Sequence, residues 1–156
     1  GKKLGDYQFG DNSYAYLDKM TKLCKENGIE LILIKSPSIY PYWYKEWDDQ
    51  MVAYAKENNL KYINFLELAD EIGIDYSTDT YDAGLHLNLS GAEKLSDYFG
   101  KILIDEYGLE DHRNDEEYRK IWDAKVKAYY DMKEDQYREL AEYGYLKSYG
   151  AAKPDK

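Results

Sequence analysis

The chain has 156 residues, which is enough for one domain with a hydrophobic core but short for two. Acidic residues outnumber basic ones by 31 to 21, and the net charge of −10 would repel nucleic-acid phosphates and anionic lipid headgroups. We therefore expect no nucleic-acid partner. The longest apolar run, Leu31 to Ile34, is too short to cross a bilayer, so no transmembrane segment is predicted in this chain.

The composition predicts no metal and no cofactor. One cysteine, Cys24, and two histidines, His86 and His112, have none of the spacings that are typical of metal sites. Tyrosine is the outlier with 19 residues, which indicates a wet core edge, a contact surface or a site lined by phenols. A leading Gly1 is common after removal of a tag, so we expect the natural protein to begin further upstream.

Helices and strands are expected to alternate in the first half of the chain. A helix with Ser13 as its N-cap should run to Gly28, and the apolar run 29–35 is typical of a buried parallel strand. A second helix around 47–55 and a second strand from Lys61 follow. This order predicts an α/β fold with parallel strands, flanking helices and right-handed crossovers.

Two further helices are expected after the second strand. A short helix over 66–72 should stop at Gly73, and a longer one should begin at Ser90 and end near Gly108. Ser90 and Glu93 have the spacing of a capping box, in which each side chain accepts a hydrogen bond from the other residue's backbone N–H.

The predicted organisation is an α/β domain over 1–110 and a helical C-terminal extension over 111–156. In the extension, Asn114 is the expected cap of a long amphipathic helix that breaks near Gly144. Only two strands are convincing, and a two-stranded parallel sheet leaves faces and edges uncovered. We therefore expect the sheet to be incomplete, with further strands supplied upstream or by a partner chain.

Chemistry is expected at the carboxyl ends of the two strands, where ligand sites of open parallel sheets gather. The loop after the first strand, 36–44, and the loop leading to Asp82 and His86 should meet at this edge. A carboxylate beside a histidine can fix the tautomer of the ring and stabilise its charged form while the ring takes a proton from a serine. The alternative is a histidine bonded to a backbone carbonyl, with Asp82 capping a turn.

The segment from Asp82 to Leu103, "DAGLHLNLSGAEKLSDYFGKIL", resembles the last block of the SGNH (GDSL-type) hydrolase superfamily, in its envelope-associated branch. The strands before it are also similar, so that the resemblance covers about residues 13–107. It implies a flavodoxin-like domain in which His86 is the general base and Asp82 its orienting carboxylate. Three residues stand between them where the family has two, which leaves Asp79 as an alternative partner.

The family's nucleophilic serine follows its first strand in a Gly-Asp-Ser block, and here only Gly10-Asp11-Asn12-Ser13 comes near this pattern. That match has one insertion and no apolar strand before it, so Ser13 is read as a helix cap. We expect the serine upstream of this chain. The resemblance then implies the C-terminal part of a serine esterase or O-acyltransferase, inactive by itself, in an extracellular or cell-envelope location.

A substrate surface is expected beside the proposed site. Tyr40, Tyr42 and Trp43 lie in the loop 36–44, where aromatic rings and phenol hydroxyls suit stacking on sugars, and Asn88 is a further candidate. The predicted ligand is an acylated carbohydrate or a small ester. The alternative is that the tryptophan covers the core and that Asn88 braces its loop.

Two other functional classes are compatible with the sequence. One is a non-catalytic SGNH-like module that binds a glycan or a protein. The other is an interaction module whose tyrosine-rich C-terminal helix docks on another chain, of which a homodimer is one form.

Overall fold

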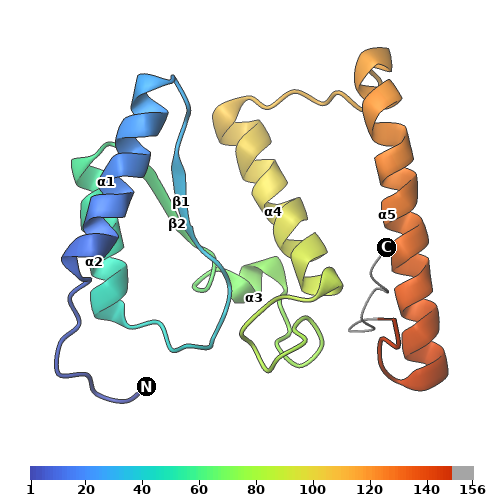
Figure 1. Cartoon of the computed structure of the whole chain (residues 1–156), viewed down its shortest axis with the longest axis horizontal. Helices are drawn as coiled ribbons and strands as arrows, with labels where there is room; N and C mark the ends of the chain where they lie inside the picture. Colours follow the sequence, from blue (N-terminus) through green and yellow to red (C-terminus); the bar gives the residue numbers. More distant parts are fainter. Residues whose placement is uncertain (149–156) are drawn as a thin grey trace, which may run out of the picture. The chain divides into compact units, whose positions relative to one another are not determined.

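The computed structural model describes residues 1–148, in which seven elements follow one another in the order that Figure 1 shows. They fall in two compact units, the first Gly1–Lys101 and the second starting at Ile102. The elements are α1 (Asp11–Glu26), β1 (Ile32–Lys35), α2 (Lys45–Glu57), β2 (Lys61–Asn64), α3 (Ala69–Ile72), α4 (Leu89–Tyr107) and α5 (Glu116–Tyr143).

The sheet of the described chain consists of β1 and β2, which pair in parallel. Their register places Leu33 opposite Tyr62 and Ile34 opposite Ile63. One more bond continues the ladder, since the Phe65 amide donates to the Lys35 carbonyl over 2.9 Å. The prediction of helices alternating with parallel strands is confirmed at this coarse level, with two strands as expected.

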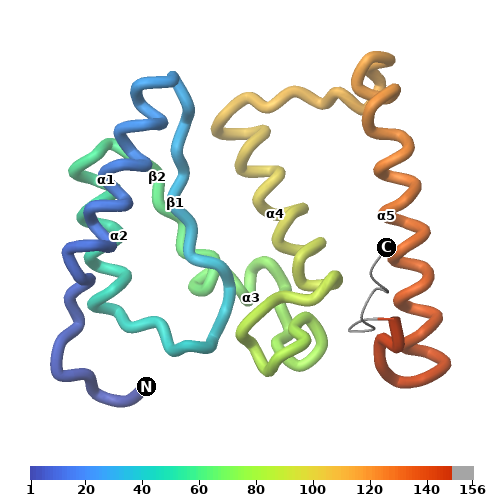
Figure 2. Tube along the Cα trace, in the orientation of Figure 1, coloured from blue at the N-terminus to red at the C-terminus, as the bar shows by residue number. Residues whose placement is uncertain are grey.

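One face of the sheet is covered by both α1 and α2. Leu33 forms a small buried cluster with Tyr54 and Ala55 of α2, and Tyr14 and Leu17 of α1 pack against the same cluster. Both helices therefore lie on the same side of the strands, as the ribbon and the Cα trace also show (Figures 1 and 2). Burial of these apolar side chains is what attaches the two helices to the sheet.

Phe65, at the end of β2, is the most buried large side chain near the other face. It has no exposed surface, and its ring meets the edges of two α4 rings, Phe99 at 5.3 Å and Tyr98 at 6.3 Å between centroids. Such edge-to-face pairs suit the quadrupoles of aromatic rings. This contact joins β2 to the first part of α4.

The prediction that the first strand is buried is wrong for one of its faces. Only Leu33 of β1 is buried, whereas Ile34 keeps 49% of its surface exposed and its register partner Ile63 keeps 7%. A central parallel strand is normally covered on both faces. β1 is instead an edge strand, and one of its two faces is left largely uncovered.

Three predicted helix caps are wrong although the helix ends are close. Ser13 lies inside α1, whose N-cap is Gly10. The α4 helix is capped by Asn88, whose side-chain oxygen accepts from the Gly91 amide over 3.1 Å, and α5 is capped by Asp115 rather than Asn114. The observed cap lies one to three positions from the predicted one in each case, and only the backbone path selects which residue occupies it.

In the second unit, α5 is a long helix that ends at Gly144, where φ is +74°. None of its residues is buried, and its surface carries pairs of opposite charge one turn apart, such as Lys127 with Asp131 at 2.6 Å. The long C-terminal helix is confirmed. No helix in residues 1–148 combines the length and apolar character needed to cross a membrane.

We predict that Phe65→Ala destabilises the chain by about 3–5 kcal/mol, because it removes a fully buried ring and leaves a cavity against α4. Urea unfolding followed by far-UV circular dichroism measures this. The matched control is Val52→Ala, on the exposed surface of α2, which should change stability by less than about 0.5 kcal/mol. Equal effects of the two substitutions would contradict the assignment of Phe65 to the core.

Candidate functional site

The two loops at the carboxyl end of the sheet meet as predicted. The Ile39 amide, in the loop after β1, donates to the Gly84 carbonyl over 3.0 Å. Gly84 has φ +96°, and a Cβ there would collide with the Ile39 side chain. Only glycine therefore allows this close approach, which fixes the loop of Asp82 and His86 against the loop 36–44.

Asp82 and His86 form a hydrogen-bonded pair. His86 Nδ1 lies 2.5 Å from Asp82 Oδ2, and the other carboxylate oxygen accepts from the His86 backbone amide over 2.7 Å. Desolvation raises the pKa of Asp82, but hydrogen bonds from the ring and amide of His86 outweigh it, so the pKa lies below its usual value. A charged carboxylate that accepts at Nδ1 holds the ring in one orientation and favours the tautomer with its proton on Nδ1.

The Nε2 side of the His86 ring is not bonded to any described residue. The His86 side chain is 59% exposed. The ring of Tyr81, which the sequence did not single out, lies nearly parallel to the imidazole with the centroids 5.8 Å apart. In this arrangement Nε2 is open to a hydroxyl or substrate from outside the described residues.

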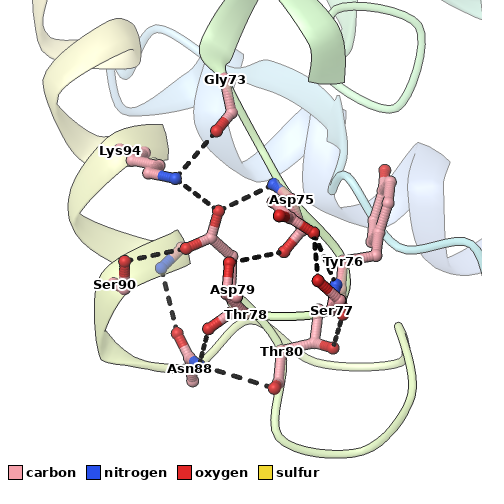
Figure 3. Close-up of polar contacts among 11 residues, drawn as sticks. Gly73, Asp75, Tyr76, Ser77, Thr78, Asp79, Thr80, Asn88, Ser90 and Lys94 are labelled. Atoms are coloured by element: carbon pink, nitrogen blue, oxygen red, sulfur yellow. Dashed lines mark hydrogen bonds and ion pairs between the residues drawn. The ribbon is translucent and has the colours of Figure 1, made fainter.

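Asp79 does not contact His86 but anchors the start of α4 (Figure 3). Its side chain is 1% exposed and accepts from Lys94 Nζ at 2.6 Å, from Ser90 Oγ at 2.8 Å and from the Asp75 amide at 2.8 Å. Burial raises the pKa of Asp79, but these three donors outweigh it and leave the pKa lowered. With all of these bonds directed elsewhere, the alternative role of Asp79 as the partner of the histidine has no support in this geometry.

Asn88 connects the same loop to α4 (Figure 3). Its side-chain amide donates to the carbonyls of Thr78 at 2.7 Å and Thr80 at 3.5 Å, while its oxygen caps α4 at Gly91. Both amide hydrogens are therefore in use, and none is free for a substrate. Asn88 braces the loop rather than lining a binding surface.

Trp43 belongs to an aromatic cluster that covers the sheet end. Its ring lies 5.5 Å from that of Trp47 and 6.2 Å from that of Phe9, and its indole N–H donates to Asp48 Oδ1 over 3.1 Å. The same Asp48 oxygen accepts from Tyr62, whose pKa is raised first by burial and then by this carboxylate. Trp43 thus has a packing role, which was the alternative interpretation.

The other two predicted substrate residues are accessible. Tyr40 is 66% exposed and Tyr42 is 53% exposed, and both follow Ile39, the residue that contacts the histidine loop. The ring of Tyr42 meets the ring of Tyr44 edge-on, 4.8 Å away. These two phenols leave ring surface open to a ligand beside the site.

Lys35 was not singled out from the sequence, although it ends β1 and holds the next loop together. Its ammonium donates to the Ser36 carbonyl at 2.7 Å and to both the carbonyl and the hydroxyl of Ser38 at 3.1 and 2.9 Å. Burial lowers its pKa, and three acceptors satisfy its three hydrogens. The signal in the sequence was a charged residue that closes an otherwise apolar strand.

No family model, curated protein or solved structure matches this chain. The SGNH resemblance therefore stays a prediction that depends on the residues themselves. Of its predicted site residues, the structure brings together Asp82 and His86. Ser13, which the sequence indicated as a helix cap rather than the nucleophile, lies inside the first turn of α1.

We predict that Asp79→Asn destabilises the chain by about 2–4 kcal/mol at pH 7, because a buried partner of Lys94 loses its charge. Since folding lowers the pKa of Asp79, this stabilisation is present above the unfolded pKa of about 3.9 and decreases as the pH falls through the folded-state value. Urea unfolding at pH 7 and below pH 4 should show the difference from wild type shrinking. Asp97→Asn, exposed on α4, is the control.

We predict that Gly84→Ala destabilises the chain by about 2–4 kcal/mol, through both its positive φ and the collision with Ile39. Gly28 is a matched control, because its φ is +64° and a Cβ there meets nothing within 4 Å. Gly28→Ala should cost only the strain, about 1 kcal/mol. Thermal unfolding of both variants compares them, and equal losses would show that the two loops do not depend on this contact.

Proposed function

We propose that this chain is the C-terminal part of an SGNH-like serine esterase or O-acyltransferase and that it contributes the Asp-His half of the catalytic triad. The observation that carries the proposal is the bond of 2.5 Å between Asp82 Oδ2 and His86 Nδ1, together with an Nε2 that has no partner within residues 1–148. A histidine buried for a structural role would have both nitrogens hydrogen-bonded, whereas the His86 side chain is 59% exposed and only its Nδ1 is bonded within residues 1–148. The proposed lineage depends on the resemblance of residues 82–103.

In the proposed reaction, a serine hydroxyl gives its proton to His86 Nε2 while its oxygen attacks the carbonyl carbon of an ester. Asp82 stays ionised and stabilises the imidazolium, which agrees with its lowered pKa. The histidine then returns the proton to the leaving alcohol, and an acyl-enzyme remains. Water or an acceptor hydroxyl, deprotonated by the same nitrogen, removes the acyl group and restores the serine.

The serine would come from a part of the polypeptide outside residues 1–148. Within that range His86 Nε2 has no hydroxyl partner, and Ser13 is held in the first turn of α1. The hydroxyls of Ser36 and Ser38 lie in the neighbouring loop, where Ser38 accepts from Lys35. We therefore expect the isolated chain to be inactive on esters.

The proposed substrate class is an acyl ester on a carbohydrate, for which the resemblance implies a cell-envelope glycan. Tyr40 and Tyr42 support it, because two exposed phenols next to the site can stack on sugar rings and bond to hydroxyls. Trp43 and Asn88 are not included, since both side chains are occupied internally.

A non-catalytic SGNH-like module that binds a glycan or a protein is the second candidate. The absence of a hydroxyl at Nε2 among the described residues is the observation that favours it. The two candidates differ in what they require of His86. Catalysis needs a basic Nε2, whereas binding through the tyrosines does not.

The state of the imidazole can be measured in this chain directly. We predict that neutral His86 carries its proton on Nδ1 and that Asp82→Asn allows a mixture of tautomers. The ¹⁵N chemical shifts of the ring nitrogens measure this. His112 is the internal control, because its Nδ1 lies 3.7 Å from Asp115, too far for the same restraint. A mixed His86 tautomer in the wild-type chain would contradict the proposed pair.

Activity is tested in a longer polypeptide that includes the serine. His86→Ala should abolish hydrolysis of p-nitrophenyl acetate with folding intact, and Asp82→Asn should reduce kcat by about 10³–10⁴-fold. His112→Ala should leave the rate unchanged. Unchanged turnover in His86→Ala would refute the catalytic role, and glycan binding in the same variant would favour the binding module.

A further inference from the structure

The outer edge of β1 is the least satisfied part of the sheet. β1 pairs on one side with β2, and in residues 1–148 no strand pairs with its other side. Exposed sheet edges offer a row of peptide groups to another strand, and proteins usually cover them. The strand Ile32–Lys35 contains no proline that would block pairing at this edge.

The direction of the peptide groups follows from the ladder. The Lys35 carbonyl accepts from Phe65, so the peptide groups of Lys35 and, by alternation, of Leu33 point toward β2. Those of Ile32 and Ile34 point the opposite way. Two N–H groups and two carbonyls therefore face outward with the spacing of one more strand.

Apolar side chains surround this edge on both faces. A groove of about 350 Å³ is lined by the four residues of β1 and by Leu17 and Met20 of α1. Because successive side chains of a strand alternate, Ile34 belongs to the face opposite to that of Leu33. Met20 is 43% exposed and Ile34 is 49% exposed, which is high for residues beside a parallel strand. A strand with apolar side chains on both faces would cover them, whereas a helix or a small ligand would leave the outward peptide groups unpaired.

The connection through α1 decides where such a strand belongs. The helix α2 links β1 to β2 from the face that carries the Leu33 cluster, and α1 packs on the same face. Crossovers between parallel strands are right-handed. When two successive crossover helices lie on the same face of the sheet, each new strand is therefore added on the same side of the strand before it. A strand leading into α1 would thus lie on the side of β1 opposite to β2, at the open edge.

We propose that the outer edge of β1 binds one further parallel strand, apolar on both faces, that belongs to the same polypeptide and leads into α1. This inference does not depend on the proposed enzymatic activity, since it follows from the ladder, the groove and the crossover. A second copy fits less well. If the β1 edges of two copies paired, their strands would lie about 4.8 Å apart. The two α1 helices beside these edges need about 8–10 Å between their axes, so they would compete for the same space.

The test joins a surrogate strand to the chain. A copy of residues 30–35, "ELILIK", is attached to Gly1 through a Gly/Ser linker of about ten residues, which keeps it at millimolar effective concentration. Amide hydrogen exchange is followed by NMR. In the unextended chain Ile32 and Ile34 should exchange fast and Leu33 slowly; in the extended chain Ile32 and Ile34 should slow by at least about tenfold.

The control extension carries proline in place of both isoleucines of the surrogate strand, which removes its donors and should restore fast exchange. The Leu33 and Lys35 amides report in every sample that the sheet is folded. Fast exchange at Ile32 and Ile34 in the extended chain, with Leu33 protected, would overturn the proposal. Protection in the unextended chain that grows with protein concentration would also overturn it, because the occupant would then be a second copy.

Discussion

The buried carboxylate of Asp79 is the constraint on which the site depends. It joins the loop after α3, through the Asp75 amide, to two residues of α4, Ser90 and Lys94. A charged group that is 1% exposed is tolerated only with several donors, and here each bond also fixes a different piece of chain. The loop that carries Asp82 and His86 starts and ends at this anchor, so its geometry follows from it.

Around this anchor, short-range bonds set the position of the histidine. Asn88 ties the end of the loop to the carbonyls of Thr78 and Thr80, and Gly84 lets the loop approach Ile39. Asp82 then needs only local geometry to reach His86, four residues later. The result is a histidine that is oriented on one side and open on the other, which is what a general base requires.

The sheet and the site have the same kind of incompleteness. Among residues 1–148, β1 has unpaired peptide groups and apolar side chains at its outer edge, and His86 has a nitrogen without a partner at the carboxyl end of the sheet. In parallel α/β folds, the ends of neighbouring strands supply the residues of one site. A strand docked on β1 would end at that same edge, where the proposed serine is needed. The two proposals are independent in their evidence and compatible in their geometry.

Much of the local structure could be predicted from the sequence, because it depends on neighbours along the chain. The apolar runs at Ile32 and Tyr62, the helical periodicity before Gly108 and Gly144, and the proximity of Asp82 to His86 are of this kind. The caps were less predictable. Asn88 and Ser90 are both good capping residues, and the burial of Asp79 assigned Ser90 to another bond.

Contacts between distant segments could not be predicted from the sequence. That Asp79 pairs with Lys94, that Trp43 gives its N–H to Asp48, and that Ile34 remains exposed depend on how elements pack. The sequence by itself determined the order of the helices, the parallel strands and the candidate pair, since periodicity and short spacing encode them. The tertiary structure alone decided which polar groups are consumed internally and which stay open, because desolvation and hydrogen-bond partners exist only once the chain has folded.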